Sequence, residues 1–201
     1  MKLHGQGAVV LDTPEVADGL PSIHVDDEEG GYIAGCHALS FSRETVAFIG
    51  RNTGIHHAMD RLRGFRRAMD AAGITVMEFD CPDLDMASGV TAAEEVLALK
   101  ERPRTIFAAN DLLALGALQT FLRAGMKVPN DMAIIGYDGI VYAAQAAVPL
   151  TTVQQPAYEM GALAARTLVE DIEGQYRTIE PRVFRPELIV RESTPQARET
   201  D

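Results

Sequence analysis

Short hydrophobic runs alternate along the chain with longer segments in which hydrophobic residues recur every three or four positions. The short runs are rich in β-branched and aromatic residues, which is typical of strands buried on both faces. The longer segments have one hydrophobic face, as amphipathic helices do. Strands are predicted at residues 45–49, 75–79, 105–109 and 133–136, and helices at about 28–39, 58–72, 88–100, 111–124 and 156–172.

Strands that alternate with helices in this way predict βα units, and therefore an α/β fold with a doubly wound, mainly parallel sheet. In the helix at 111–124, Leu115, Leu118 and Leu122 are predicted to face the core. The first 25 residues hold only a strand at 8–11 and an extended piece at 22–25, and they resemble the end of a domain more than its start. Residues 182–190 are predicted to be extended.

Composition narrows the class of protein. The formal net charge is −11, which disfavours non-specific binding to nucleic acid because phosphates require a clustered basic face. No hydrophobic stretch approaches the ~20 residues of a membrane span, and the N-terminus has no signal core. Cys36 and Cys81 form no CxxC pair, so neither a disulfide framework nor a zinc site is expected. These features predict a soluble, cytoplasmic protein with no membrane partner.

Polar residues follow the predicted strands. In an open parallel sheet, ligands bind beyond the carboxyl ends of the strands. The residues at these ends are Asp12, Arg51, Asn52, Asp80, Asn110, Asp111 and Asp138, with Arg61 on the helix after the strand at 45–49. Carboxylates, amides and guanidinium groups can hydrogen-bond a small polar ligand, for example through vicinal hydroxyls or a carboxylate.

Each of these residues also has a structural interpretation. Asp111 opens a helix, where an N-cap role is the stronger expectation. Asn110 fits a turn as well as a ligand contact, and Asp138 before Gly139 is a turn signal. Arg61 lies on an arginine-rich helix and is by default a solvated cation. The acidic run at 26–29 precedes a helix, where negative charge suits the helix dipole.

Motifs of catalysis and of metal or cofactor binding are missing from the sequence. His56 and His57 lie near Asp60, but no third ligand is spaced to complete a metal site. The chain has no phosphate-binding loop, no G-x-G-x-x-G, no nucleophile elbow and no H-E-x-x-H. We therefore predict no metal, no cofactor and no catalytic residue.

A series of longer motifs points to a known family. Residues 61–65, Arg-Leu-Arg-Gly-Phe, fit the pattern R-x-x-G-[FYW]. The other motifs lie at 108–117, 125–131, 134–138, 149–156 and 188–194. In this order and spacing they resemble the effector-binding core of the LacI/GalR family of bacterial transcription regulators, which is similar to type I periplasmic sugar-binding proteins. The resemblance covers about residues 8–194.

The resemblance implies a periplasmic-binding-protein-like type I fold with two lobes. Residues 26–154 and 185–194 are expected to form a complete C-terminal lobe. Residues 1–25 and 155–184 would form part of an N-terminal lobe, and 195–201 a polar tail. The first βα units of the N-terminal lobe and a helix-turn-helix head are expected to be absent, so operator DNA would be bound only through a head outside these residues.

Ligand-binding residues also follow from the resemblance. Arg61, Asn110 and Asp138 match family positions that hydrogen-bond the effector, and Asp12 matches a fourth position from the other lobe. Arg61 would hold a ligand oxygen with two hydrogen bonds.

Two departures from the family pattern bear on the ligand. Leu84 stands where the family usually places an aromatic ring that stacks on the ligand, so the ligand's apolar face would be smaller. Gly139 stands where a second acidic or amide residue is common.

The function implied is that of a small-molecule sensor, with a carbohydrate or related polar metabolite as effector, that controls DNA binding by a homodimer. A transport-type sugar-binding protein is an alternative, although no export signal is visible. An α/β enzyme with a carboxylate-lined cleft is a third possibility and would turn over its ligand. Because half the cleft would be missing, we expect this chain to bind effector weakly or not at all, and its exposed sheet edges favour association.

Overall fold

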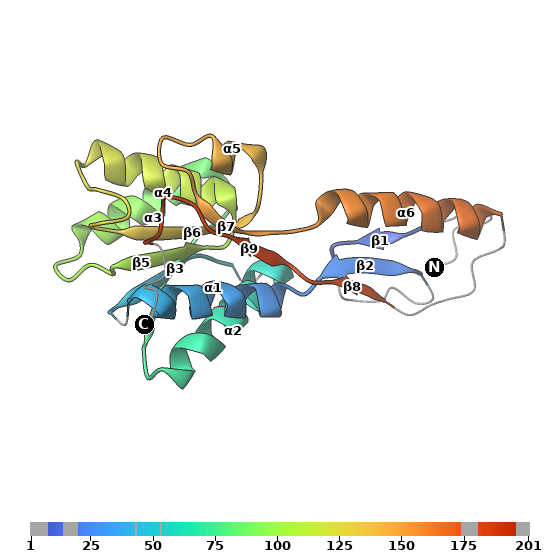
Figure 1. Cartoon of the computed structure of the whole chain (residues 1–201), viewed down its shortest axis with the longest axis horizontal. Coiled ribbons are helices and arrows are strands. Elements are labelled where there is room, and N and C mark those ends of the chain that lie inside the picture. The colour runs from blue at the N-terminus through green and yellow to red at the C-terminus, as the bar shows by residue number, and fades with distance from the viewer. Residues whose placement is uncertain (1–7, 14–19, 43, 53, 174–180, 196–201) are drawn as a thin grey trace, which may run out of the picture. The chain divides into compact units, whose positions relative to one another are not determined.

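The computed structural model describes residues 8–13, 20–42, 44–52, 54–173 and 181–195, and it divides into two compact units (Figure 1). Unit 1 comprises Met1–Asp26 and Gln155–Pro186, and unit 2 comprises Asp27–Gln154 and Glu187–Asp201. The chain therefore passes between the units after residues 26, 154 and 186. The sequence places these boundaries after residues 25, 154 and 184.

Unit 2 is built on a six-stranded sheet with the strand order β4-β3-β5-β6-β7-β9. Every neighbouring pair is parallel except β7 and β9, which are antiparallel. The predicted doubly wound, mainly parallel sheet is confirmed. Its strands are β3 (Val46–Arg51), β4 (Val76–Asp80), β5 (Thr105–Ala108), β6 (Ala133–Asp138), β7 (Thr151–Gln154) and β9 (Glu187–Ile189).

Helices cover both faces of this sheet. Helices α1 and α2 pack together on one face, and α3 and α4 on the other (Figure 1). The predicted helices are present, and their bounds are α1 Asp27–Phe41, α2 His56–Ala71, α3 Met86–Ala98 and α4 Asp111–Arg123. The short α5 (Val141–Ala144) and strand β7 were not predicted, because one turn shows no periodicity and the sequence Thr-Thr-Val-Gln lacks a hydrophobic run.

The helices of each pair approach closely because glycines lie at their crossings. A Cβ at Gly64 of α2 would overlap the carbonyl oxygen of Glu28, and one at Gly31 of α1 would overlap that of Arg61. The backbones of α1 and α2 are therefore in direct contact, which brings the first turn of α1 onto the first half of α2.

The inward face of α4 differs from the prediction. Leu118 is buried as expected, but Leu115 and Leu122 are only half-buried. Leu113 and Phe121 are buried more completely, because α4 is hydrophobic on more than one face and the sheet covers only one of them. Leu115 and Leu122 pack against the edge of this core, so their predicted inward orientation holds, but the prediction missed Leu113 and Phe121.

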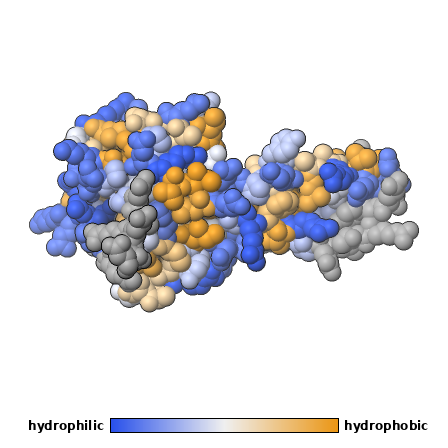
Figure 2. All heavy atoms as spheres, viewed as in Figure 1, coloured by the Kyte–Doolittle hydropathy of each residue, from blue (hydrophilic) through white to orange (hydrophobic). Residues whose placement is uncertain are grey.

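Hydrophobic residues also remain at the surface of unit 2. Figure 2 shows them gathered over β9, the edge strand of the sheet, where Leu188 and Ile189 are half-buried and Val190 is exposed. Exposed edge strands favour association with other chains.

Unit 1 is a smaller layer of sheet and helix. Strands β1 (Val10–Leu11), β2 (Ser22–Val25) and β8 (Arg182–Phe184) form a parallel sheet in the order β1-β2-β8. The helix α6 (Ala157–Ile172) packs on it, and the buried hydrophobic cluster consists of Ile23, Val25, Met160 and Ala164. The predicted strand at 8–11 is shorter than expected, and the predicted polar tail lies outside the described residues except for Pro195. No helix among the described residues could span a bilayer.

Candidate ligand site

The order of strands in unit 2 locates a crevice. The chain moves from β3 outward to β4 and then returns across the sheet to β5, so the winding direction reverses between β3 and β5. Loops on the two sides of such a switch point diverge, and ligands of open α/β sheets bind there. Arg61 lies in the first half of α2, Asn110 lies in the β5–α4 connection, and β6 beside them ends at Asp138.

Arg61 is almost completely buried, with 2% of its surface exposed. Its Nε donates to Asp27 Oδ1 at 2.7 Å, and its Nη1 donates to the carbonyl oxygen of Ala109 at 2.7 Å. The same Nη1 lies 3.4 Å from Asp138 Oδ1, and the guanidinium carbon lies 3.7 Å from the centre of the Tyr137 ring. Burial alone would lower the pKa of this guanidinium, but the carboxylates of Asp27 and Asp138 outweigh it and raise the pKa.

Asp138 differs from its neighbours because its carboxylate reaches the surface, with 29% of the side chain exposed. Its φ is 102°, in a region that glycine favours. Asp12 in unit 1 is likewise exposed and has φ 58°, and among the described residues these two are the non-glycine positions with positive φ. Backbone strain of this kind clusters at ligand sites, where the surrounding structure over-determines it.

Asn110 holds two loops together. Its Oδ1 accepts from the backbone N–H of Leu113 as the N-cap of α4, and its Nδ2 donates to the carbonyl oxygen of Leu84, both at 2.9 Å. The N-cap predicted at Asp111 was therefore wrong by one residue. Leu84, half-buried, lies in the β4–α3 loop that Asn110 supports.

Asp111 is fully buried and fixes the segment after Asp138. One carboxylate oxygen accepts from the Thr152 hydroxyl at 2.7 Å, and the other accepts from the backbone N–H of Ile140 at 2.9 Å. Burial raises the pKa of this carboxyl from 3.8 to about 6, although both hydrogen bonds act in the opposite direction.

The glycine after Asp138 also has a structural reason. Gly139 has φ +74°, and a Cβ there would lie 2.6 Å from Cγ of Gln154 on the neighbouring strand β7. The Gln154 side chain thus occupies the space that a second acidic or amide side chain would require. Consequently, Asp138 is the only carboxylate that this turn presents.

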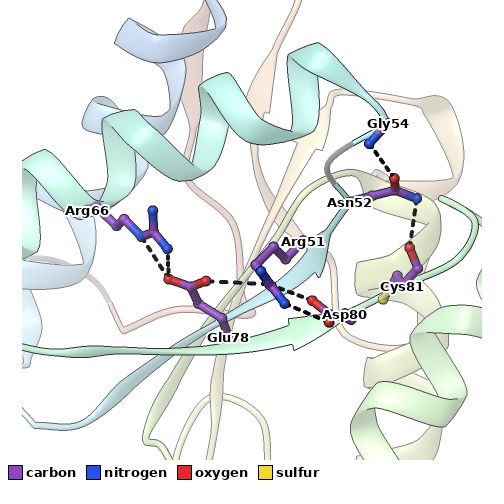
Figure 3. A network of polar contacts seen from close by, with 7 residues as sticks. All are labelled: Arg51, Asn52, Gly54, Arg66, Glu78, Asp80 and Cys81. Carbon is purple, nitrogen blue, oxygen red and sulfur yellow. Dashed lines mark hydrogen bonds and ion pairs between the residues drawn. The ribbon is translucent and has the colours of Figure 1, made fainter.

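Arg51 and Asn52, also at the predicted rim, belong to a network at the edge of the sheet (Figure 3). Arg51 pairs with Asp80, with Nε 2.5 Å from Oδ1, and Glu78 links it to Arg66 of α2. Asn52 donates to the carbonyl oxygens of Cys81 and Pro82 and accepts from the backbone N–H of Gly54. These groups satisfy one another and tie the β3–α2 loop to the β4–α3 loop, so their role in this structure is to support the rim.

Unit 2 therefore brings Arg61 and Asp138 into contact and places Asn110 against Leu84, whereas Asp12 lies in unit 1. Asp27 is the partner of Arg61 that the sequence did not identify. Asp27 belongs to the acidic run at 26–29. A favourable interaction with the helix dipole already accounted for that run, so the sequence did not point to an ion pair with Arg61. Among the described residues, no cluster of three His, Cys, Asp or Glu side chains is placed to hold a metal.

Comparison with known proteins agrees with this architecture. Residues 37–194 match the periplasmic binding protein-like domain family. A LacI-family protein of Sanguibacter keddieii, of known structure, is 32% identical, with a TM-score of 0.86 over 96% of this chain and 75% of the other. The chain belongs to the LacI family.

Relatives of this LacI-family chain are transcriptional regulators. It is 35% identical to the repressor PurR of Photobacterium profundum over 92% of its length, and 41% identical to the regulator DegA of Bacillus subtilis over 85%. It spans 56% and 51% of those two proteins. A LacI-family regulator of Enterococcus faecium with bound ribose is 29% identical, with a TM-score of 0.88 over 94% of this chain and 71% of the other.

Proposed function

We propose that this chain is the effector-sensing part of a LacI-family transcription regulator that acts in the cytoplasm, and that its effector is a small hydroxyl-rich molecule. In this proposal unit 2 is the C-terminal lobe of the sensor and unit 1 is part of the N-terminal lobe. Two structural neighbours support a carbohydrate effector: the LacI-family regulator of Enterococcus faecium holds ribose, and the transcriptional regulator CelR holds cellobiose. Operator DNA would be bound by a head outside these residues.

The geometry of Asp138 carries this proposal. It stands at the carboxyl end of a central strand, its backbone is held in a left-handed conformation, and its carboxylate is partly exposed beside a buried cation. A carboxylate in this position accepts hydrogen bonds from ligand hydroxyls. Asp138 and Leu84 of unit 2 would contact the effector, and Arg61 and Asn110 would hold these two residues in place.

A thermal-shift screen tests the site. The panel contains D-ribose, cellobiose, sugar phosphates, nucleosides and amino acids, applied to the protein, to Asp138→Asn and to the control Asp70→Asn, an exposed acid on α2. We expect a ligand that raises the Tm of the protein and of the control but not of Asp138→Asn. Recovery of this ligand unchanged separates a sensor from an enzyme. A ligand that stabilises Asp138→Asn equally would place the site elsewhere.

Unit 1 has the features of an incomplete lobe. Among the residues of unit 1 that the structure describes, four form the buried hydrophobic cluster, while Tyr158, Val169 and Ile172 of α6 are more than half exposed. We therefore expect weak effector binding by this chain, and tighter binding by a version with the additional length of the relatives. Equal affinities of the two versions would contradict this expectation.

Helices α3, α4 and α5 present a surface suited to a second copy. A groove of about 770 Å³ lies here, and its lining includes Met86, Leu112, Leu115, Leu122 and Tyr142. Hydrophobic residues are visible near α5 in Figure 2. We propose that the homodimer forms through this groove, because one hydrophobic patch on each protomer can be buried against its own copy about a two-fold axis.

Analytical ultracentrifugation tests the dimer. Leu115→Lys places a charge in the groove and is expected to produce a monomer. Ala71→Lys places the same charge on the exposed side of α2, on the opposite face of the sheet, and should leave the dimer intact. If the Leu115→Lys protein still dimerises, the dimer interface does not lie in this groove.

A further inference from the structure

The turn that follows β6, residues 138–140, contains two successive residues with positive φ. They are Asp138, at 102°, and Gly139, at 74°. Positive φ is ordinary for glycine, but an aspartate held there raises the free energy of the folded state. Such a conformation persists only where the surrounding structure imposes it. A group close to this turn therefore holds Asp138 in its strained conformation.

The turn is fixed at both of its ends. At its start, Asp138 is the last residue of β6 and is paired in register with Gln154 of β7. At its end, the backbone N–H of Ile140 donates to Oδ2 of Asp111 at 2.9 Å. Only Gly139 lies between these two anchors. The chain thus passes from the strand to Asp111 within two residues, and both of them have positive φ.

Asp111 can serve as an anchor because its own carboxylate is held in place. It is the first residue of α4 and is fully buried. Its second oxygen, Oδ1, accepts from the Thr152 hydroxyl of β7 at 2.7 Å. Gly136 of β6 leaves the room that this oxygen needs, because a Cβ there would overlap Oδ1. One buried carboxylate therefore connects α4, β7 and the turn after β6.

Building on the proposed function, we propose that Asp111 is a positioning residue of the ligand site. By accepting from Ile140 it holds the turn, so that Asp138 keeps its strained backbone and presents its carboxylate to the effector. Asp111 is buried and acts only through Asp138, whose side chain is 29% exposed. Without the Asp111 acceptor, Asp138 relaxes toward an extended backbone, and its carboxylate leaves the position that the effector requires.

Thermal unfolding of a double-mutant cycle tests this role without any ligand. In the protein, Asp111→Ala removes the anchor but also relieves the strain at Asp138, which offsets part of the cost. In the Asp138→Gly background there is no such strain, so Asp111→Ala should lower the Tm further. The control is Asp85→Ala, because Asp85 also accepts from a backbone N–H, that of Ser88 at the start of α3. It should lower the Tm equally in both backgrounds.

A conservative variant separates the anchor from the charge of Asp111. Asp111→Asn removes the repulsion between the carboxylates of Asp111 and Asp138 but keeps an oxygen to which Ile140 can donate. It should therefore lower the Tm by the same amount, or not at all, in both backgrounds. If Asp111→Ala acts equally in the two backgrounds, or if Asp111→Asn differs between them as much as Asp111→Ala does, the inference is overturned.

Nuclear magnetic resonance checks the anchor in the protein itself, whatever the stability of the variants. An amide proton that donates to a carboxylate changes its chemical shift when that carboxylate is protonated. The Ile140 amide proton should therefore titrate with the pKa of Asp111, which burial raises to about 6, and should not do so in Asp111→Asn. The Ser88 amide proton should titrate at lower pH, because its hydrogen bond lowers the pKa of Asp85. An Ile140 amide proton with no titration near pH 6 would rule out the anchor.

Calorimetry with D-ribose and cellobiose connects the anchor to binding. We expect Asp111→Ala to bind whichever sugar the protein binds at least about tenfold more weakly, because the binding-competent turn is less populated. Asp111→Asn should remain within about threefold of the protein. Unchanged affinity in Asp111→Ala overturns the inference. If the protein binds neither sugar, the carbohydrate effector of the proposed function fails, while the double-mutant cycle and the Ile140 titration still decide the role of Asp111.

Discussion

Asp111 offers a quantitative test of the structure. Its carboxyl is fully buried under the loop that carries Asp138, and burial raises its pKa from 3.8 to about 6. The folded state therefore holds this proton more tightly than the unfolded state does. The stabilisation is complete below the unfolded pKa of 3.8 and is lost as the pH rises through the folded pKa of about 6.

The size of the effect follows from the two pKa values. Their difference corresponds to about 3 kcal/mol in the free energy of unfolding, of which about 2 kcal/mol is lost between pH 4.5 and pH 7.5. Other groups titrate over the same range, so the effect is isolated by comparison with Asp111→Asn, which has no carboxyl. Changes in the hydrogen bonds to Thr152 and Ile140 shift the variant's stability by a similar amount at each pH and do not affect the slope.

The measurement is urea unfolding followed by far-UV circular dichroism, since the chain contains no tryptophan. The stability of the protein minus that of Asp111→Asn should fall by about 2 kcal/mol from pH 4.5 to pH 7.5. Asp85 provides a control of opposite sign. Its hydrogen bond from Ser88 lowers the pKa of its carboxyl, so the corresponding difference for Asp85→Asn should shrink as the pH falls through that lowered pKa. An Asp111 difference that is flat or rises with pH would refute the burial argument.

Three further predictions follow from individual positions. Gly64→Ala, whose Cβ would overlap the carbonyl oxygen of Glu28, should destabilise the protein by more than about 2 kcal/mol in urea unfolding, whereas Gly161→Ala, with open space around its Cβ, should not. His37 is buried, which lowers its pKa, so its contribution should be present above about pH 6.5 and be lost as the pH falls further; a stability difference between the protein and His37→Gln that does not shrink on acidification would contradict this. Asp138→Gly and Asp138→Ala both lose the carboxylate beside Arg61 and should abolish effector binding, but Asp138→Gly should have the higher Tm because only glycine relieves the positive φ; equal Tm values would argue against strain at this residue.

Much of the fold could be predicted because its signals are local. A buried parallel strand is a continuous hydrophobic run, and a helix that covers a sheet has a periodic hydrophobic face, so β3 and α2 were visible in a few residues each. The prediction failed where a buried segment has few hydrophobic residues, and where a helix has hydrophobic residues on more than one face. Strand β7 is buried despite two threonines, because Thr151 and Thr152 find partners in the fold, and α4 has more hydrophobic residues than its inner face needs.

The candidate site could be predicted only in part. Residues at strand ends are identifiable because parallel strands place their carboxyl ends at one edge. Whether the side chain of such a residue is available to a ligand depends on which other protein groups form hydrogen bonds or ion pairs with it. Asn110 and Asp111 are both good N-caps, and the choice between them was made by distant donors that take up the Asp111 carboxylate.

The sequence alone therefore determined the α/β class, the positions of the main helices and strands, the family resemblance and the polar residues at the strand ends. The tertiary structure decided which of those residues are buried and what they pair with. Arg61 meets Asp27 from 34 positions away because α1 and α2 cross closely at their glycines, and it meets Ala109, at the end of β5, from 48 positions away. Burial and pairing depend on contacts between segments distant in sequence, so no local pattern of residues contains them.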